Sequence, residues 1–484
     1  MTFRRAALIL ACLLAGPALA QAPRPSGTSA GPSARQQPAA AAGKQPTAKG
    51  TAAPNRPAAT ATRGAVPPRS ASASRPAAPR GGTAASRTRP PGAAASRPGL
   101  AAPRPPVRPT PAAVPAAPVV IPAPEAAAVP QGAAPLLPAA AAALSAVPVA
   151  RRGAPVLAGP FLPAPEPSGP TASCEPPGAP VRNLESTGFY ADPAFSRPDP
   201  LRMRADAEAG RPLVEWLTLV QRAVARHRAG EAGAADCALA ALDQWAKGGA
   251  LLGAFNLQGG YHRKWALAGA ALSFLAIREA PGLDPVALGR TARWLGEVAE
   301  AVRPHYERNS TAIISDVRNN HAAWAGLAVA AAGIAGGNRV QLDWGVARLR
   351  AQLAQVDERG VLPQEAKRGA MALHYHLFAL DAVAALERLA AANGIALTGG
   401  ERSAYARLRD LCLAAARDPA RMEAIAGVPQ SDPWLGERAP LATADGLEIA
   451  SIATPTPELD EALASFRPYA ARWLGGAITG WWKG

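Results

Sequence analysis

An abrupt change of composition near residue 170 limits where this chain can fold. Between Gln21 and Pro170 the sequence consists mainly of Ala, Pro, Gly, Ser and Arg, with almost no aromatic residues. Such a segment buries too little apolar surface to offset the entropy lost on ordering, so we expect a disordered, partly polyproline-like tether over 21–170. The folded part is therefore expected at 171–484.

The first 20 residues have the pattern of a secretory signal. Two arginines precede an apolar run over 6–14, and Ala18-Leu19-Ala20 supplies the small residues of a cleavage site. We expect residues 1–20 to be removed and the protein to be periplasmic, with secretion as an alternative. A lipoprotein acylated at Cys12 is less favoured because the apolar run before it is very short. No later run of about 20 apolar residues is uninterrupted, so stable membrane insertion is not expected.

The net positive charge of the chain comes entirely from the N-terminal segments, 1–170. The chain has a formal net charge of +16, but residues 171–484 hold 33 basic and 33 acidic residues. The folded part is therefore neutral, and the basic pI does not predict a nucleic-acid partner. We expect the tether to be a solvated spacer, with loose attraction to anionic polymer of the cell envelope as the alternative.

Three cysteines remain once the signal is removed. In an oxidising export compartment two of them can pair, and we expect a Cys174–Cys237 disulfide that joins the entry segment to an early helix. Cys412 lies in an Ala/Leu-rich helical pattern, where a free cysteine usually packs as an apolar residue.

Residues 171–484 have a helical pattern throughout, with Ala and Leu recurring at spacings of three and four. Gly and Pro breaks separate candidate helices near 213–229, 234–246, 262–279, 285–302, 320–335, 340–356, 369–392 and 402–416. These short-linked helix pairs are too many for a four-helix bundle, and their sequences show no readable repeat. They favour an all-α fold, an (α/α) toroid or barrel around a central cleft. The segment 472–482 is less helical and is expected to add a short extended piece.

The run Asn319-Asn320-His321-Ala322-Ala323-Trp324 has the first group of residues suited to chemistry. If a helix starts near Asn319, the Asn320 amide, the His321 imidazole and the Trp324 indole share one face. Asn319 fits a helix cap equally well.

A second group follows about fifty residues later. Arg368 and Tyr375 are seven apart, which is two turns of one helix, so a single face can present both to a cleft. The guanidinium would then lower the phenol pKa from its reference of about 10. Alternatively, Arg368 is exposed to solvent and Tyr375 packs in the core. His374 and His376 fall on different faces, and with neither His-x-x-x-His nor Cys-x-x-Cys present no metal site is predicted.

These motifs resemble the alginate (mannuronate) lyase family, polysaccharide lyase family 5. The resemblance rests on Asn319-Asn320-His321-x-x-Trp324, Leu362-Pro363-x-Glu365-x-Lys367-Arg368 and Ala372-Leu373-His374-Tyr375-His376. Further matches are Asp236-Cys237-x-Leu239-Ala240, Arg263-Lys264-Trp265-Ala266-Leu267, Asp343-Trp344-Gly345-Val346, Gln355-Val356-Asp357 and Leu474-Gly475-Gly476. The blocks keep the family's order across nearly all of 171–484.

The resemblance implies an incomplete (α/α) toroid with a deep cleft, acting as a monomer without a cofactor. The family's catalytic residues correspond to Asn320, His321, Arg368 and Tyr375.

The resemblance also places substrate contacts at Trp324 and Lys264. Two departures concern the same cleft. Ala323 stands where the family commonly has an aromatic residue, and the stretch 185–190 lacks the family's lysine, so Tyr190 is expected as a lid contact instead.

The function implied is cleavage of 1,4-linked poly-mannuronate by β-elimination. Asn320, His321 and Arg368 would neutralise the uronate carboxylate, and Tyr375 would take the C5 proton and then protonate the leaving oxygen. Alternatively, His321 is the base and Tyr375 the acid.

Other functions remain as alternatives. A glucuronate-containing polymer is the alternative substrate. A toroid glycoside hydrolase would need two facing carboxyls, for which Asp316 and Glu365 are the acids near the motifs. A non-catalytic exopolysaccharide-binding or scaffolding protein is the third alternative. A polyanion substrate further predicts that positive charge gathers in the cleft.

Overall fold

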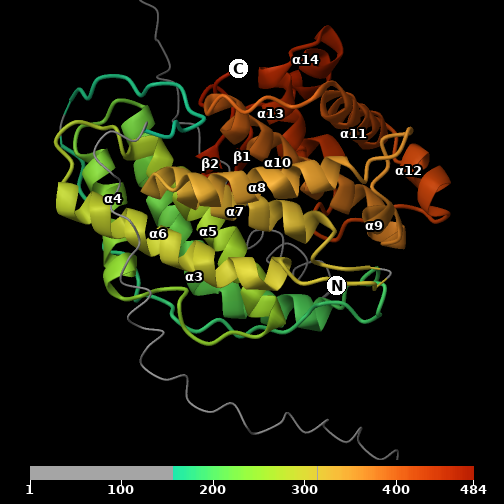
Figure 1. Ribbon diagram of the computed structural model, residues 1–484, viewed down its shortest axis with the longest axis horizontal. Coiled ribbons are helices and arrows are strands. Elements are labelled where there is room, and N and C mark those ends of the chain that lie inside the picture. The colour runs from blue at the N-terminus through green and yellow to red at the C-terminus, as the bar shows by residue number, and fades with distance from the viewer. Residues whose placement is uncertain (1–155, 170, 313) are drawn as a thin grey trace, which may run out of the picture. The chain divides into compact units, whose positions relative to one another are not determined.

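The computed structural model describes residues 156–169, 171–312 and 314–484, and it is mostly helical, as predicted (Figure 1). The predicted signal peptide and most of the predicted tether lie outside these residues. The α-helices are α3 (Pro200–Arg228), α4 (Ala234–Lys247), α5 (Leu257–Ile277), α6 (Pro285–Tyr306), α7 (Asn320–Gly336), α8 (Arg339–Leu353), α9 (Pro363–Ala366), α10 (Ala372–Ala392), α11 (Gly399–Arg417), α12 (Ala420–Ala426), α13 (Asp445–Ala453) and α14 (Pro457–Ala464). Short 3₁₀ helices span Gly369–Met371, Pro440–Thr443 and Arg472–Leu474. The predicted extended piece is an antiparallel pair, β1 (Ala470–Ala471) and β2 (Gly476–Ala477).

Successive helix pairs form the incomplete (α/α) toroid (Figure 1). α3 packs against α4, α5 against α6, α7 against α8 and α10 against α11. One helix of each pair also meets its counterpart in the next, because α3 contacts α5, α5 contacts α7, α7 contacts α10 and α10 contacts α13. These five helices form the inner layer, and α4, α6, α8 and α11 form the outer one.

Three of the inner helices, α5, α7 and α10, are buried over most of their residues. α7 is buried from Ala322 to Ile334, as expected of a helix with other helices all around it. A Cβ on Gly345 of α8 would collide with the carbonyl oxygen of Gly326, so α7 and α8 meet backbone to backbone. The segment Gly369–Ala392, which includes α10, is apolar and long enough to cross a membrane, but 78% of its most apolar window is buried within the protein.

The structure describes packed residues before the predicted boundary at 171. Leu157 and Phe161 are buried, and the Phe161 ring packs edge-on against Trp482 with 5.2 Å between ring centroids. The boundary was placed too late because these apolar residues stand in a Pro-rich segment and their partners lie far away in the sequence, Trp482 for Phe161 and Arg278 for the Leu157 carbonyl. The Cys174–Cys237 disulfide forms and Cys412 is free and buried, both as predicted.

Side-chain caps set where the two helices that carry much of the site begin. Asn256 accepts a hydrogen bond from the Gly259 amide at the start of α5, and Asn319 accepts one from the His321 amide at the start of α7. The interpretation of Asn319 as a cap is therefore confirmed, and His321 is the second residue of its helix.

Candidate active site

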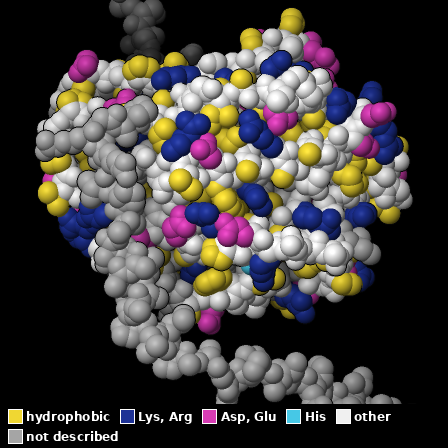
Figure 2. Space-filling view, viewed as in Figure 1, with side chains coloured by type: hydrophobic (Ala, Val, Ile, Leu, Met, Phe, Trp, Pro, Cys, Tyr) yellow, Lys and Arg dark blue, Asp and Glu magenta, His cyan; other side chains and the backbone are white. Residues whose placement is uncertain are grey.

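A cavity of about 930 Å³ is lined by the segment 186–195, α3, α5, the loop before α7, the start of α10 and the C-terminal segment. Its charged wall holds five arginines and two acids: Arg202, Arg211, Arg308, Arg368 and Arg472, with Asp206 and Asp316. On the outer face shown in Figure 2, basic and acidic side chains are interspersed. Positive charge in this neutral folded part is thus enriched in the cavity, as predicted for a protein that holds a polyanion.

Arg368, Tyr375 and Tyr190 meet on the cavity wall. The Arg368 Cζ atom lies 3.5 Å from the centre of the Tyr375 ring, and Arg368 Nε donates to the Phe195 carbonyl at 3.0 Å. The Tyr375 hydroxyl contacts the Tyr190 hydroxyl, which is contributed by the segment before α3. Tyr190 therefore lies where a lid contact was predicted.

Arg368 and Tyr375 do not share one helix, contrary to the prediction. Arg368 lies in the turn after α9, and α10 begins only at Ala372. Gly369, with φ at +56°, interrupts the helical path between them. The turn nevertheless brings the guanidinium over the phenol ring.

Glu365 is a fully buried carboxylate that joins Asn320 to Arg368. Its Oε1 accepts from the Asn320 backbone amide at 2.6 Å and from Asn320 Nδ2 at 3.0 Å, and its Oε2 lies 3.8 Å from Arg368 Nη1. Burial raises the pKa of Glu365, although the Arg368 charge and the Asn320 hydrogen bonds oppose the rise. Asn320 is fully buried and outside the cavity lining, so it does not face the substrate space as predicted; its amide is engaged by Glu365.

His321 lines the cavity, whereas Lys264 lies behind it. Lys264 is 0% exposed, and its Nζ is 2.8 Å from His321 Nδ1. The Tyr261 ring stacks on the imidazole with 4.0 Å between centroids. Burial lowers the pKa of both Lys264 and His321 well below their usual values. The prediction of Lys264 as a substrate contact is wrong, because the side chain is covered by its own helix's aromatic residues and by α6.

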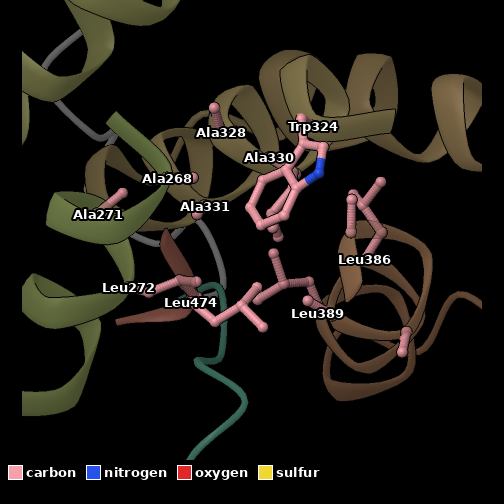
Figure 3. Packing of buried hydrophobic residues seen from close by; sticks show 14 of the residues in the cluster. Ala268, Ala271, Leu272, Trp324, Ala328, Ala330, Ala331, Leu386, Leu389 and Leu474 are labelled. Carbon is pink, nitrogen blue, oxygen red and sulfur yellow. The ribbon is translucent and has the colours of Figure 1, made fainter. Parts of the chain in front are cut away.

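Trp324 belongs to the core and not to the cleft. The side chain is 1% exposed, its Nε1 donates to the Phe378 carbonyl at 2.9 Å, and the indole points into the cluster that contains Leu386 and Leu389 (Figure 3). The predicted cleft role is wrong because α7 is covered on nearly every side. Ala323 is likewise buried, so it does not alter the cavity wall.

Most of the aromatic wall was missed from the sequence. Trp265 stacks on His321 at 5.7 Å and on Trp473 at 6.2 Å between centroids. His374, held by Asp432 at 2.7 Å, stacks on Trp434. Trp265 and His374 had a sequence signal, through their places in the blocks Arg263-Lys264-Trp265 and Ala372-Leu373-His374. His376 lies in the core, where its Nε2 accepts from the Leu362 amide and its Nδ1 donates to the Ala372 carbonyl.

Of the acidic residues that line the cavity, Asp316 is the nearest to His321 in the sequence. It accepts from the Tyr261 hydroxyl at 2.9 Å and from His305 Nε2 at 2.5 Å. Burial alone would raise the pKa of Asp316, but these hydrogen bonds and the His305 charge lower it. Because Glu365 is outside the lining, Asp316 and Glu365 do not form the facing pair that a hydrolase requires. No group of three His, Cys, Asp or Glu side chains able to hold a metal ion occurs in the described part of the chain.

The fold and the site thus combine an (α/α) toroid with a cavity that has an arginine-rich, aromatic wall. The family described as alginate lyase matches residues 183–422. An alginate lyase from Azotobacter vinelandii is 33% identical over 274 residues, which are 54% of this chain and 72% of that protein. A polysaccharide lyase from Stenotrophomonas maltophilia is 29% identical over 309 residues, which are 63% of this chain and 88% of that protein. The chain belongs to the alginate lyase family, and it is a polysaccharide lyase.

Solved structures share the fold. The crystal structure of alginate lyase A1-III from Sphingomonas species A1 has a TM-score of 0.51 and 21% identity, covering 64% of this chain and 86% of that one. A tyrosine-to-phenylalanine variant of A1-III, complexed with tetrasaccharide, has a TM-score of 0.55 and 20% identity with the same coverage.

Proposed function

We propose that this protein cleaves 1,4-linked poly-β-D-mannuronate, the mannuronate polymer of alginate, by β-elimination and leaves a 4,5-unsaturated uronate at each new end. The observation that carries the proposal is the meeting of Arg368 and Tyr375 in an arginine-rich cavity that His321 also lines. The A1-III relative complexed with tetrasaccharide supports an oligosaccharide chain as the occupant.

The chemistry begins at C5 of a uronate, whose proton is weakly acidic because the attached carboxylate is already negative. His321 and Arg368 neutralise that carboxylate as positioned donors, and Asn320 acts indirectly by fixing Glu365 beside Arg368. Tyr375 takes the C5 proton, the electrons of the C5–H bond form the C4–C5 double bond, and the C4–O bond breaks.

The leaving oxygen must then be protonated. In mannuronate the C5 hydrogen and the C4 oxygen lie on the same side of the ring, so Tyr375 returns the same proton to that oxygen. Tyr375 therefore begins and ends the cycle as a phenolate, which the Arg368 guanidinium over the ring stabilises. Imidazole and guanidinium supply the neutralisation, so the reaction as proposed needs no metal ion.

A glucuronate polymer is the second candidate, because glucuronate differs from mannuronate only at C2 and has the same arrangement at C4 and C5. The lack of a lysine between 185 and 190 favours it; the buried position of Ala323 removes the other reason. The signal-like N-terminus supports a periplasmic location, with secretion as the alternative, and the basic residues of 21–170 support loose contact with envelope polyanion.

Mass spectrometry of the products tests the proposal. Purified protein is incubated in EDTA with poly-mannuronate, poly-guluronate and polyglucuronate separately. Elimination predicts poly-mannuronate fragments whose masses sum to that of the parent chain, without added water. Fragment masses that exceed the parent mass by one water for each bond cleaved would establish hydrolysis, and an intact polymer in every tube would support the binding or scaffolding alternative.

A further inference from the structure

Lys264 is a buried lysine that the proposed reaction leaves without a task. Its Nζ lies over three aromatic rings, 4.1 Å from the centroid of Tyr261, 4.6 Å from that of Trp265 and 5.6 Å from that of Tyr306. Burying an amine in such a place costs stability unless a specific interaction offsets it. The one hydrogen bond of Nζ within the described residues goes to His321 Nδ1, at 2.8 Å.

The direction of this hydrogen bond follows from the groups around Nζ. The negative faces of the three rings attract the amine hydrogens and stabilise positive charge on the lysine. Burial lowers the pKa of Lys264, whereas the ring faces and the Asp316 charge favour the ammonium. As an ammonium, Nζ has three donors and no acceptor, so Nδ1 is the acceptor; a neutral amine, by contrast, also has a lone pair. A neutral imidazole that accepts at Nδ1 carries its proton on Nε2, the only other ring nitrogen.

We propose that Lys264, as an ammonium, is a positioning residue, which holds His321 in the tautomer protonated at Nε2 so that the imidazole donates to the uronate carboxylate and cannot serve as the base. The inference rests on the proposed function, because it assigns a role to His321 within that reaction. It also separates the two mechanisms that the sequence left open, since a base needs an unprotonated nitrogen facing the substrate. Tyr375 is then the group that takes the C5 proton.

The surrounding groups keep His321 neutral. Burial, followed by the charges of Lys264, Arg368 and His305, lowers the pKa of His321 well below its usual value. Tyr261 from α5 covers one face of the ring, and Tyr306 from α6 lies on the far side of Lys264. Asp316, in the loop before α7, attracts the lysine charge and partly opposes the effect of burial on Lys264.

The first test is a ¹⁵N spectrum of histidine-labelled protein near neutral pH, with the His321 signals assigned by their loss in His321→Gln. The inference predicts an unprotonated Nδ1 and a protonated Nε2 in the native protein. In Lys264→Met, which keeps the length of the side chain but has no donor, it predicts a mixture of tautomers. A proton on Nδ1 in the native protein, or an unchanged spectrum in Lys264→Met, would overturn the inference.

Kinetics provide the second test. Losing one positioned donor typically costs about 10²-fold or more in kcat, so a partial loss of the correct tautomer predicts a fall of about 10- to 100-fold in Lys264→Met, with KM changed less than about threefold. The acid limb of the kcat/KM profile should move to higher pH, because a neighbouring positive charge is gone. Lys264→Gln, whose amide can donate to Nδ1, should recover part of the activity.

The controls separate this inference from stability and from the proposed function. Replacing a buried amine by methionine should leave Tm unchanged or raise it, so a lower kcat with unchanged Tm excludes misfolding. Lys247→Met, at a side chain 57% exposed, is the matched control and should alter neither spectrum nor kinetics. Inactivity of the native protein on every uronate polymer would sink the proposed function, whereas the tautomer of His321 can still be measured.

Discussion

Replacing Trp324 by phenylalanine should weaken the fold and spare the reaction. The sequence pattern predicts a cleft residue at this position, but the structure buries the indole and bonds its Nε1 to the Phe378 carbonyl. A core residue and a cleft residue give opposite results on substitution. The variant therefore tests whether the side of α7 that carries Trp324 faces the core or the cavity.

The magnitude follows from what Trp324→Phe removes. Two buried ring carbons contribute about 1.6 kcal/mol at roughly 0.8 kcal/mol each. The hydrogen bond adds about 1 kcal/mol, and the Phe378 carbonyl, inside α10, keeps its helical partner. We expect a loss of about 2 to 3 kcal/mol in the free energy of unfolding, with kcat and KM unchanged well below the melting temperature.

Denaturant titration and steady-state kinetics on the same preparations measure both quantities. Trp265→Phe is the matched control, because this indole lines the cavity, stacks on His321 and has no hydrogen-bond partner for its Nε1 among the described residues. It should change KM or kcat with little effect on stability. A Trp324→Phe variant that keeps its stability but shows a several-fold higher KM would refute the core assignment.

Two further predictions concern stability. Replacing Cys174 and Cys237 together by serine opens a loop with a sequence separation of 63 and should cost about 4 kcal/mol in denaturant titration, whereas Cys412→Ala, outside the bridge, should not alter the effect of a reducing agent. Burial lowers the pKa of His376 to about 4, against about 6.5 in the unfolded chain. The unfolded chain therefore binds more protons below pH 6.5, so stability is fully present above that pH and is lost as pH falls toward 4, by about 1.4 kcal/mol per unit. Unfolding measured at pH 7 and pH 5 should show this loss, and His376→Gln should reduce it; an equal loss in both proteins would contradict the assignment.

The helices could be predicted because Ala/Leu periodicity and Gly or Pro breaks are local signals. α3 shows the limit of the method. Its predicted start near 213 follows from Pro212, yet the helix begins at Pro200, capped by Asp199, and tolerates Pro212 in its interior. A proline inside a helical pattern marks a helix boundary in many chains but not in all.

The site was predicted only in part because a helix that is buried on all sides has no polar stripe to show which of its residues line the cavity. His321, Arg368, Tyr375 and Tyr190 line the cavity as expected from their motifs. Asn320, Trp324 and Lys264 do not, because a helix that is apolar all round offers no periodicity to tell its cavity side from its core side. His321 lies in the first turn of α7 and lines the cavity, whereas Trp324, three residues further along the helix, is buried in the core.

The most direct test of the central claim is the ultraviolet absorbance of the unsaturated uronate, followed over time on poly-mannuronate in EDTA. The native protein and Tyr375→Phe are compared, with Tyr405→Phe as the matched control because that buried hydroxyl has no partner among the described residues. The account predicts a steady rise with the native protein and with Tyr405→Phe, and a loss of at least about 10³-fold in Tyr375→Phe, from removing the acid and base together. A Tyr375→Phe variant that eliminates at the native rate would contradict it.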